Sequence, residues 1–232
     1  MALERVATGI QGLDELVNGG IPQGSTVLVC GGAGTGKTIL CTQFLYNGVS
    51  KYNEPGVLVL LESHLKNIVW DVDSFNWDLR KYQDKGLLKI YRMRLDPSRS
   101  IRDELGVITQ MVKETKAKRL VIDSTTAFAV WVREESNLRK TLYDFVDGLK
   151  ELNVTTLMTA ETKGDKTSFS AFGVEEFISD AVIALYFTPP NRSIFVRKMR
   201  GTAHNKNVHP MDITPNGIVV KSKDEVLWEA LK

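Results

Sequence analysis

The stretch Gly31-Gly32-Ala33-Gly34-Thr35-Gly36-Lys37-Thr38 decides the fold of this chain of 232 residues. It matches the pattern G-x-x-x-x-G-K-[ST], in which glycines allow a tight loop and a lysine and a hydroxyl follow at fixed positions. An apolar run, residues 25–30, precedes the loop, and a segment with helical spacing, residues 37–48, follows it. The loop therefore lies between a predicted strand and a predicted helix, which is the context that a phosphate-binding loop requires.

This loop predicts a site for a nucleoside triphosphate, with ATP and Mg²⁺ as the expected cofactors. Backbone N–H groups of such a loop turn toward the phosphates, and the following helix adds its unpaired N–H groups and the positive end of its dipole. Lys37 is expected to neutralise phosphate charge and Thr38 to ligate Mg²⁺. The alternative, a chance glycine-rich turn, is disfavoured by the strand-loop-helix context. The expected nucleotide-binding residues of the loop are Gly32, Ala33, Gly34, Thr35, Gly36, Lys37, Thr38 and Ile39.

Strand-like and helix-like segments alternate after the loop, which predicts an α/β fold with a mostly parallel, twisted sheet flanked by helices. Helices are expected at residues 37–48, 65–75, 101–115 and 138–152. Strands are expected at residues 25–30, 57–61, 88–92, 119–122, 154–159, 181–187 and 193–197. After Phe187 the helical pattern stops, and the turn residues at 189–191 and 214–217 predict an antiparallel β extension at the C-terminal end. Since no linker or repeat divides the sequence, we expect a single domain, residues 1–232.

Composition and charge narrow the classes of protein that the chain can belong to. With 43% hydrophobic and 25% charged residues, the sequence is that of an ordinary globular protein. Thirty basic and 28 acidic residues leave a net charge of +2, so no overall field attracts nucleic acid or anionic lipid. Cys30 and Cys41 lie in apolar runs, where buried thiols are more common than a disulfide or a metal site. Because residues 1–5 do not resemble a signal peptide and no apolar run is long enough to span a bilayer, we expect a cytoplasmic protein without membrane attachment.

Two acidic residues follow apolar strands and are candidates for metal binding and catalysis. Asp123 ends the run 119–122, where an acidic residue of a nucleotide hydrolase orients Mg²⁺ and its waters; we expect it to act on the metal through water. An Asp at this place is otherwise a common turn or helix-cap residue. Glu62 follows the run 57–61 and could accept a proton from attacking water, or could form a surface pair with Lys66.

Polar residues near the end of the predicted strand 154–159 give weaker signals. The stretch Thr159-Ala160-Glu161-Thr162 could sense the γ-phosphate, although helix or turn capping explains these residue types nearly as well. The polar segment 162–171 could contact nucleic acid or receive a phosphoryl group, but most loops of this composition are only exposed to solvent.

Several further stretches, taken together, resemble the KaiC family of RecA-like ATPases over nearly the whole chain. They are GIQGLDEL (residues 9–16), GGIP (19–22), the phosphate loop, VIDS (121–124), FGVEEF (172–177) and KMRGT (198–202). The resemblance implies a RecA-like core for the α/β fold. It also implies assembly with further copies of the chain as a hexameric ring.

The resemblance assigns roles that composition and spacing do not. In the family a strand ends in paired glutamates, the first of which polarises the attacking water; Glu62 fits the first, and Ser63 stands in place of the second, so we expect slow hydrolysis. The family also implies that Lys198, Arg200 and His204 reach the γ-phosphate bound to a neighbouring subunit, with Arg200 as an arginine finger. Without the family, the charges at 197–200 would be interpreted as those of an edge strand that avoids aggregation.

Three functions remain open at this point. The leading hypothesis is an ATP-driven oligomeric switch, expected to be hexameric, that acts in signalling or regulation through a protein partner. The second is an ATP-dependent DNA-binding protein of recombination or repair, which the low net charge does not favour. The third is an ATP-dependent interaction module with little turnover, which the replacement by Ser63 keeps open.

Overall fold

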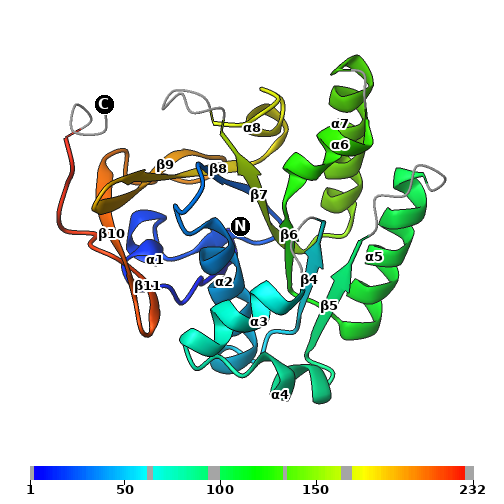
Figure 1. The fold of residues 1–232 in the computed structure, drawn as a ribbon, viewed down its shortest axis with the longest axis horizontal. Coiled ribbons are helices and arrows are strands. Elements are labelled where there is room, and N and C mark those ends of the chain that lie inside the picture. Colours follow the sequence, from blue (N-terminus) through cyan, green and yellow to red (C-terminus); the bar gives the residue numbers. More distant parts are fainter. Residues whose placement is uncertain (1–2, 62–64, 94–99, 133–134, 163–168, 228–232) are drawn as a thin grey trace.

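A twisted, mostly parallel sheet forms the centre of the molecule (Figure 1). The computed structural model describes residues 3–61, 65–93, 100–132, 135–162 and 169–227. The strand order of the main sheet is β11-β10-β9-β8-β3-β7-β6-β4-β5. Its parallel part consists of β3 (Thr26–Gly31), β4 (Gly56–Leu60), β5 (Leu88–Arg92), β6 (Arg119–Asp123), β7 (Thr155–Glu161) and β8 (Ala181–Thr188). The expected α/β class with a mostly parallel sheet is thus confirmed.

Helices cover both faces of the parallel strands, which explains why these strands are apolar throughout. Along β4, Leu58 and Leu60 pack into the core on one face, whereas Val57 and Val59 belong to the core on the other. The first core is closed by α2 (Lys37–Lys51), α3 (Leu65–Ser74) and α4 (Leu79–Asp84). The second is closed by α5 (Ile101–Thr115) and α7 (Glu135–Glu151).

The C-terminal part extends the sheet with antiparallel strands, as predicted. The strand β9 (Asn191–Met199) pairs antiparallel with β8, and β10 (Val208–Thr214) and β11 (Gly217–Val220) continue the sheet. The two chain reversals lie at the turn residues identified in the sequence, since Thr188 pairs with Asn191 and Thr214 pairs with Gly217.

Short elements complete the fold and were not predicted. They are β1 (Arg5–Val6), α1 (Leu13–Leu16), β2 (Ile21–Pro22), the 3₁₀ turn η1 (Thr125–Ala127), α6 (Phe128–Trp131) and α8 (Glu175–Ile178), besides α4. These segments are too short for a helical or alternating pattern to be counted reliably. Among the helices of the described ranges, none combines the length and the low charge that a membrane-spanning segment needs.

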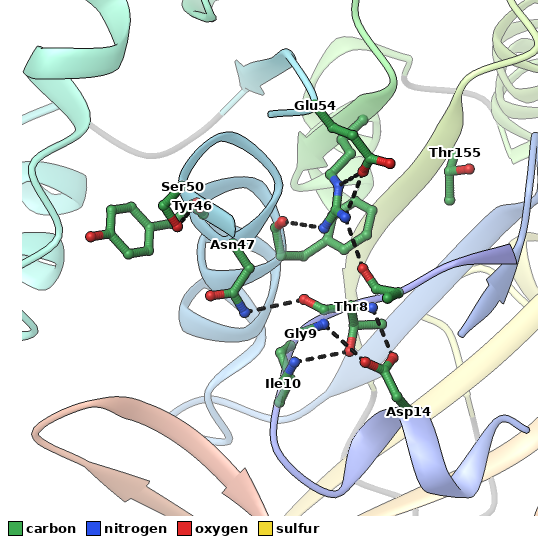
Figure 2. A network of polar contacts seen from close by, with 12 residues as sticks. Thr8, Gly9, Ile10, Asp14, Tyr46, Asn47, Ser50, Glu54 and Thr155 are labelled. Carbon is green, nitrogen blue, oxygen red and sulfur yellow. Dashed lines mark hydrogen bonds and ion pairs between the residues drawn. The ribbon is translucent and has the colours of Figure 1, made fainter. Parts of the chain in front are cut away.

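A network of polar contacts ties the N-terminal segment to the helix that follows the phosphate loop (Figure 2). The side chain of Arg119 is fully buried, forms an ion pair with Glu54, and donates to the carbonyls of Phe44 in α2 and of Ala7. Beside it, Asp14 accepts hydrogen bonds from the backbone N–H groups of Thr8 and Gly9 at 2.8 and 3.0 Å. Asn47 and Lys51 of α2 also donate to the carbonyls of Thr8 and Gly9, at 3.1 Å each, so polar contacts hold the start of the GIQGLDEL stretch against α2.

Candidate functional site

The phosphate loop lies at the carboxyl end of β3, in the middle of the sheet. Glycine is required where the loop leaves the strand, because a Cβ on Gly31 would lie 2.4 Å from the carbonyl oxygen of Leu185. Gly36, with φ 100°, is the N-cap of α2 in the left-handed region. The backbone N–H groups at the start of α2 therefore face the loop, as anion binding at a helix N-terminus requires.

Lys37, the first residue of α2, reaches back over the loop. Its Nζ donates to the carbonyl oxygens of Gly31 and Gly32, at 2.9 Å each. Burial lowers the pKa of Lys37, and the nearby carboxylates of Glu161 and Asp123 oppose this shift. The ammonium is thus held at the loop, close to two acidic side chains.

Thr38 and Asp123 meet beside the lysine, although 85 residues separate them in sequence. The hydroxyl of Thr38 donates to Oδ2 of Asp123 at 3.0 Å, and the hydroxyl of Thr159 donates to Oδ1. Asp123 is 4% exposed, and Thr159 is fully buried. Thr159 lies on β7 and Asp123 on β6, so adjacent strands align the carboxylate.

This arrangement fits Mg²⁺ in the form in which nucleotides carry it. Thr38 and Asp123 offer hard oxygen donors, which Mg²⁺ prefers, and the ion commonly takes its other ligands from phosphates and water. Within the described ranges, no three His, Cys, Asp or Glu side chains gather as a metal site of their own. The residues present therefore suit a cation that arrives with the nucleotide.

A hollow of about 310 Å³ lies against the loop and brings in two residues that sequence reasoning missed. Arg192 of β9 donates through Nε to the carbonyl of Gly34 at 3.0 Å, and its guanidinium stacks on the ring of Phe187 at 4.3 Å. Ile213 of β10 lines the same hollow, together with Ile39 of α2. Only the antiparallel extension brings these strands beside the loop, and no motif in the sequence marks them.

The loop residues predicted to bind the nucleotide lie between β3 and α2 and along the hollow. Gly32, Ala33 and Thr35 lie between β3 and α2, and Thr35 is 2% exposed, with its hydroxyl donating to the carbonyl of Gly32 at 2.9 Å. Gly34, Gly36, Lys37, Thr38 and Ile39 line the hollow. The buried thiols agree with the sequence analysis, since Cys30 and Cys41 are free and fully buried.

The candidate base, Glu62, lies outside the described residues, and so does Ser63. The strand before them, β4, ends at Leu60, which pairs with Asp123 in the sheet. The N–H of Leu61 donates to the carbonyl of Asp123 at 2.8 Å. The described chain therefore brings the carboxyl end of β4 directly beside the candidate metal-binding residue.

The residues expected to act on a neighbouring subunit lie away from the loop of their own chain. In the sheet, Met199 pairs with Ala181, whereas Gly31 pairs with Leu185, four residues further along β8. At ~3.3 Å per residue, this separates the end of β9 from the loop by about 13 Å along the strands. Arg200 and Lys198 are therefore not part of the site formed by their own loop.

Polar contacts hold these residues to their own chain. The Nζ of Lys198 donates to the carbonyls of Glu176 and Ser179, and Arg200 forms an ion pair with Asp180 at 3.4 Å. Burial and the neighbouring charge of Arg200 lower the pKa of Lys198. For His204, burial and the charge of Lys206 lower the pKa of the imidazole.

Fold and site together define a phosphate-loop nucleotide-binding protein with a RecA-like core. The loop follows a central strand of a parallel sheet, an acidic residue ends a nearby strand, and antiparallel strands extend the sheet at one side. The sequence profile of the family described as "ATPase: KaiC" matches residues 6–225. The chain therefore belongs to the KaiC ATPase family, and the resemblance found in the sequence is confirmed.

Relatives of two lengths support this assignment. The circadian clock oscillator protein KaiC of Parathermosynechococcus lividus is 39% identical over 222 residues, which are 91% of this chain but only 41% of that protein. UPF0273 protein MK0039 of Methanopyrus kandleri is 37% identical and is covered over 93% of its length. The crystal structure of the KaiC-like protein PH0186 from Pyrococcus horikoshii superposes with a TM-score of 0.86 at 41% identity, covering 94% of this chain and 99% of that one.

Proposed function

We propose that this chain binds ATP with Mg²⁺ and hydrolyses it, and that its nucleotide state switches a homohexameric ring or the contact of that ring with a partner protein. The observation that carries the proposal is the meeting of Lys37, Thr38 and Asp123 at the phosphate loop, with Thr38 and Asp123 3.0 Å apart. A cation, a hydroxyl and a carboxylate in this order are what a triphosphate and its metal require.

The residues of the site would have separate roles in binding and hydrolysing the nucleotide. The loop amides bind the β- and γ-phosphates, and Lys37 exchanges its contacts with Gly31 and Gly32 for phosphate oxygens. Thr38 would hold Mg²⁺ and Asp123 would hold it through water, and the bound metal would supply positive charge against the phosphates. Glu62 takes a proton from the attacking water. Since Ser63 supplies no second carboxylate beside this base, turnover is slow.

Exposed groups around Arg200 support a contact with a second copy of the chain. The side chain of Arg200 is 58% exposed, and it lines a hollow of about 330 Å³ that also contains Phe177 and Tyr143. These two aromatic side chains are 70% and 55% exposed. Aromatic side chains and arginine are enriched in protein interfaces. This face, which carries the finger, is therefore suited to contact the subunit whose nucleotide the finger reaches.

The names of the longer relatives give the proposal a biological direction. Those relatives are described as circadian clock oscillator proteins, and this chain covers 41–44% of their length. A single ATPase unit that changes its assembly or its partner contacts with nucleotide state would act in regulation.

Steady-state ATP hydrolysis and particle mass, measured with and without Mg²⁺ and with and without single-stranded DNA, test the proposal. We expect hexamers with slow Mg²⁺-dependent turnover, lost in Lys37→Ala and reduced in Glu62→Gln and Arg200→Ala. Stimulation that depends on single-stranded DNA would instead support a DNA-binding role. Undiminished hydrolysis in Lys37→Ala would refute the assigned site.

The assembly part of the proposal has a matched pair of variants. Phe177→Asp places a charge on the face beside Arg200, so we expect smaller particles. Trp70→Asp changes an equally exposed aromatic side chain on α3 and serves as its control. Equal particle masses for Phe177→Asp and wild type would contradict the proposed contact face.

A further inference from the structure

The turn that follows α8 contacts Lys198 and Arg200, the two cationic side chains that the proposed function assigns to the site of a neighbouring subunit. Ser179 accepts a hydrogen bond from Nζ of Lys198 at 2.6 Å, and Oδ1 of Asp180 lies 3.4 Å from Nη1 of Arg200. The backbone N–H of Arg200 also donates to the carbonyl of Asp180 at 2.9 Å. Asp180 thus contacts Arg200 through both its main chain and its side chain.

The carboxylate of Asp180 is itself fixed by elements of the core. Its Oδ2 accepts a hydrogen bond from the backbone N–H of Thr26 at the start of β3, at 3.0 Å. Its Oδ1 also pairs with Nζ of Lys150 on α7 at 3.0 Å. The side chain of Asp180 is 22% exposed, compared with 58% for Arg200. A rigid acceptor therefore holds one nitrogen of a guanidinium that otherwise extends into solvent.

We propose that Asp180 is a positioning residue for the arginine finger, holding Arg200 by Nη1 so that the rest of its guanidinium is presented to the phosphate of a neighbouring subunit. This inference rests on the proposed function. The planar guanidinium has five N–H donors, so contact with Asp180 at one nitrogen leaves donors for a phosphate oxygen. The finger is thereby ordered before the subunits meet.

The net charge of the side chains around Asp180 indicates that Asp180 positions Arg200 and does not neutralise it permanently. Asp180 carries one negative charge, whereas Lys150 and Arg200 each carry a positive one, so the group keeps a net charge of about +1. A phosphate therefore still meets a cationic site. Because an exposed pair adds little to folding stability, the contact has its effect on the orientation of Arg200.

The size of the effect follows from side-chain entropy. Ordering a long arginine side chain costs enough that fixing it beforehand changes a rate by roughly tenfold. That gain belongs to the step in which the finger meets developing charge, so it is expected in kcat rather than in KM for ATP.

The experiment compares Asp180→Asn with wild type in the full chain, using ATP hydrolysis at several ATP concentrations. The amide oxygen of the new side chain can still accept from Thr26, so the contact with β3 is retained. We expect kcat to fall about tenfold with KM changed by less than about twofold. Asp84→Asn, which changes an exposed carboxylate at the end of α4 and outside the hollow of Arg200, is the control and should retain wild-type kcat.

A double-mutant cycle separates positioning from a general structural role. In an Arg200→Ala background, Asp180→Asn should have no further effect, whereas two independent losses would multiply and would overturn the inference. If Arg200→Ala lowers kcat but Asp180→Asn does not, this inference fails and the proposed function stands. If Arg200→Ala leaves kcat unchanged, the trans finger fails and takes this inference with it.

Melting curves accompany each variant to check folding. Should Asp180→Asn melt well below wild type, Asp180→Glu replaces it, because this variant keeps the negative charge beside Lys150 and shifts it by one methylene group. We expect an intermediate kcat for Asp180→Glu. A wild-type kcat in a folded Asp180→Glu protein would overturn the requirement for a fixed acceptor.

Discussion

Thr159→Val should weaken the use of Mg²⁺ without removing any group that contacts the nucleotide. The hydroxyl of Thr159 donates to Oδ1 of Asp123, leaving Oδ2 to the hydroxyl of Thr38. Valine keeps the branched shape of the side chain on β7 but cannot donate, so the buried carboxylate loses one of its two hydroxyl partners. Asp123 then has more freedom to turn away from the metal.

The magnitude follows from the kind of contact that is lost. A hydrogen bond to a charged group contributes about 1.5–3 kcal/mol, and losing a partner that orients a metal ligand typically costs about 10- to 100-fold in metal affinity or activity. We therefore expect the Mg²⁺ concentration for half-maximal ATP hydrolysis to rise about 10- to 100-fold.

Hydrolysis at fixed ATP over a range of Mg²⁺ concentrations measures this shift, with Thr156→Val as the matched control. Thr156 is also fully buried on β7, but its hydroxyl donates to the carbonyl of Val154, away from the site. Its Mg²⁺ dependence should equal that of wild type. If Thr159→Val and Thr156→Val gave the same Mg²⁺ dependence, the orienting role of Thr159 would be refuted.

Two further predictions concern the core. Arg119→Met removes a buried guanidinium and leaves Glu54 and two backbone carbonyls without their hydrogen-bond donor. The free energy of unfolding, measured in urea, should therefore fall by about 3–5 kcal/mol. If it fell by less than in Arg80→Met, which changes an exposed arginine, the role of the network would be contradicted. Burial raises the pKa of Cys30 to about 12 and that of Cys41 well above its usual value, so both thiols stay protonated at pH 8; mass spectrometry after alkylation should find them unmodified in the native protein and modified in urea.

The sequence predicted those parts of the fold that depend on long periodic segments. The strand β5 and the helix α5 have the predicted bounds, because α5 carries a regular apolar stripe and is bounded by a capping box at Ser100. The four-residue helix α8 was missed, because so short a segment shows no period. In the sequence, α8 is marked by the family motif FGVEEF (residues 172–177) and not by a pattern of apolar residues.

The site was predictable where a motif fixes the spacing, and less so where tertiary structure creates the contact. Lys37 and Thr38 follow from the loop itself, and Asp123 from its position at the end of an apolar strand. Arg192 approaches Gly34 only because β9 returns antiparallel beside β8, and nothing near it in the sequence indicates this. The contact between Asp180 and Arg200 depends in the same way on strand register.

Complementation between an inactive variant and an impaired one tests most directly whether the site is completed by a neighbouring subunit. Lys37→Ala lacks a working loop but keeps Arg200, whereas Arg200→Ala keeps the loop and lacks the finger. If subunits mix at random in a head-to-tail ring, an equal mixture forms intact sites at about one quarter of its interfaces. We therefore predict that mixing restores about one quarter of wild-type hydrolysis. A mixture no more active than the average of its two components would contradict a site shared between subunits.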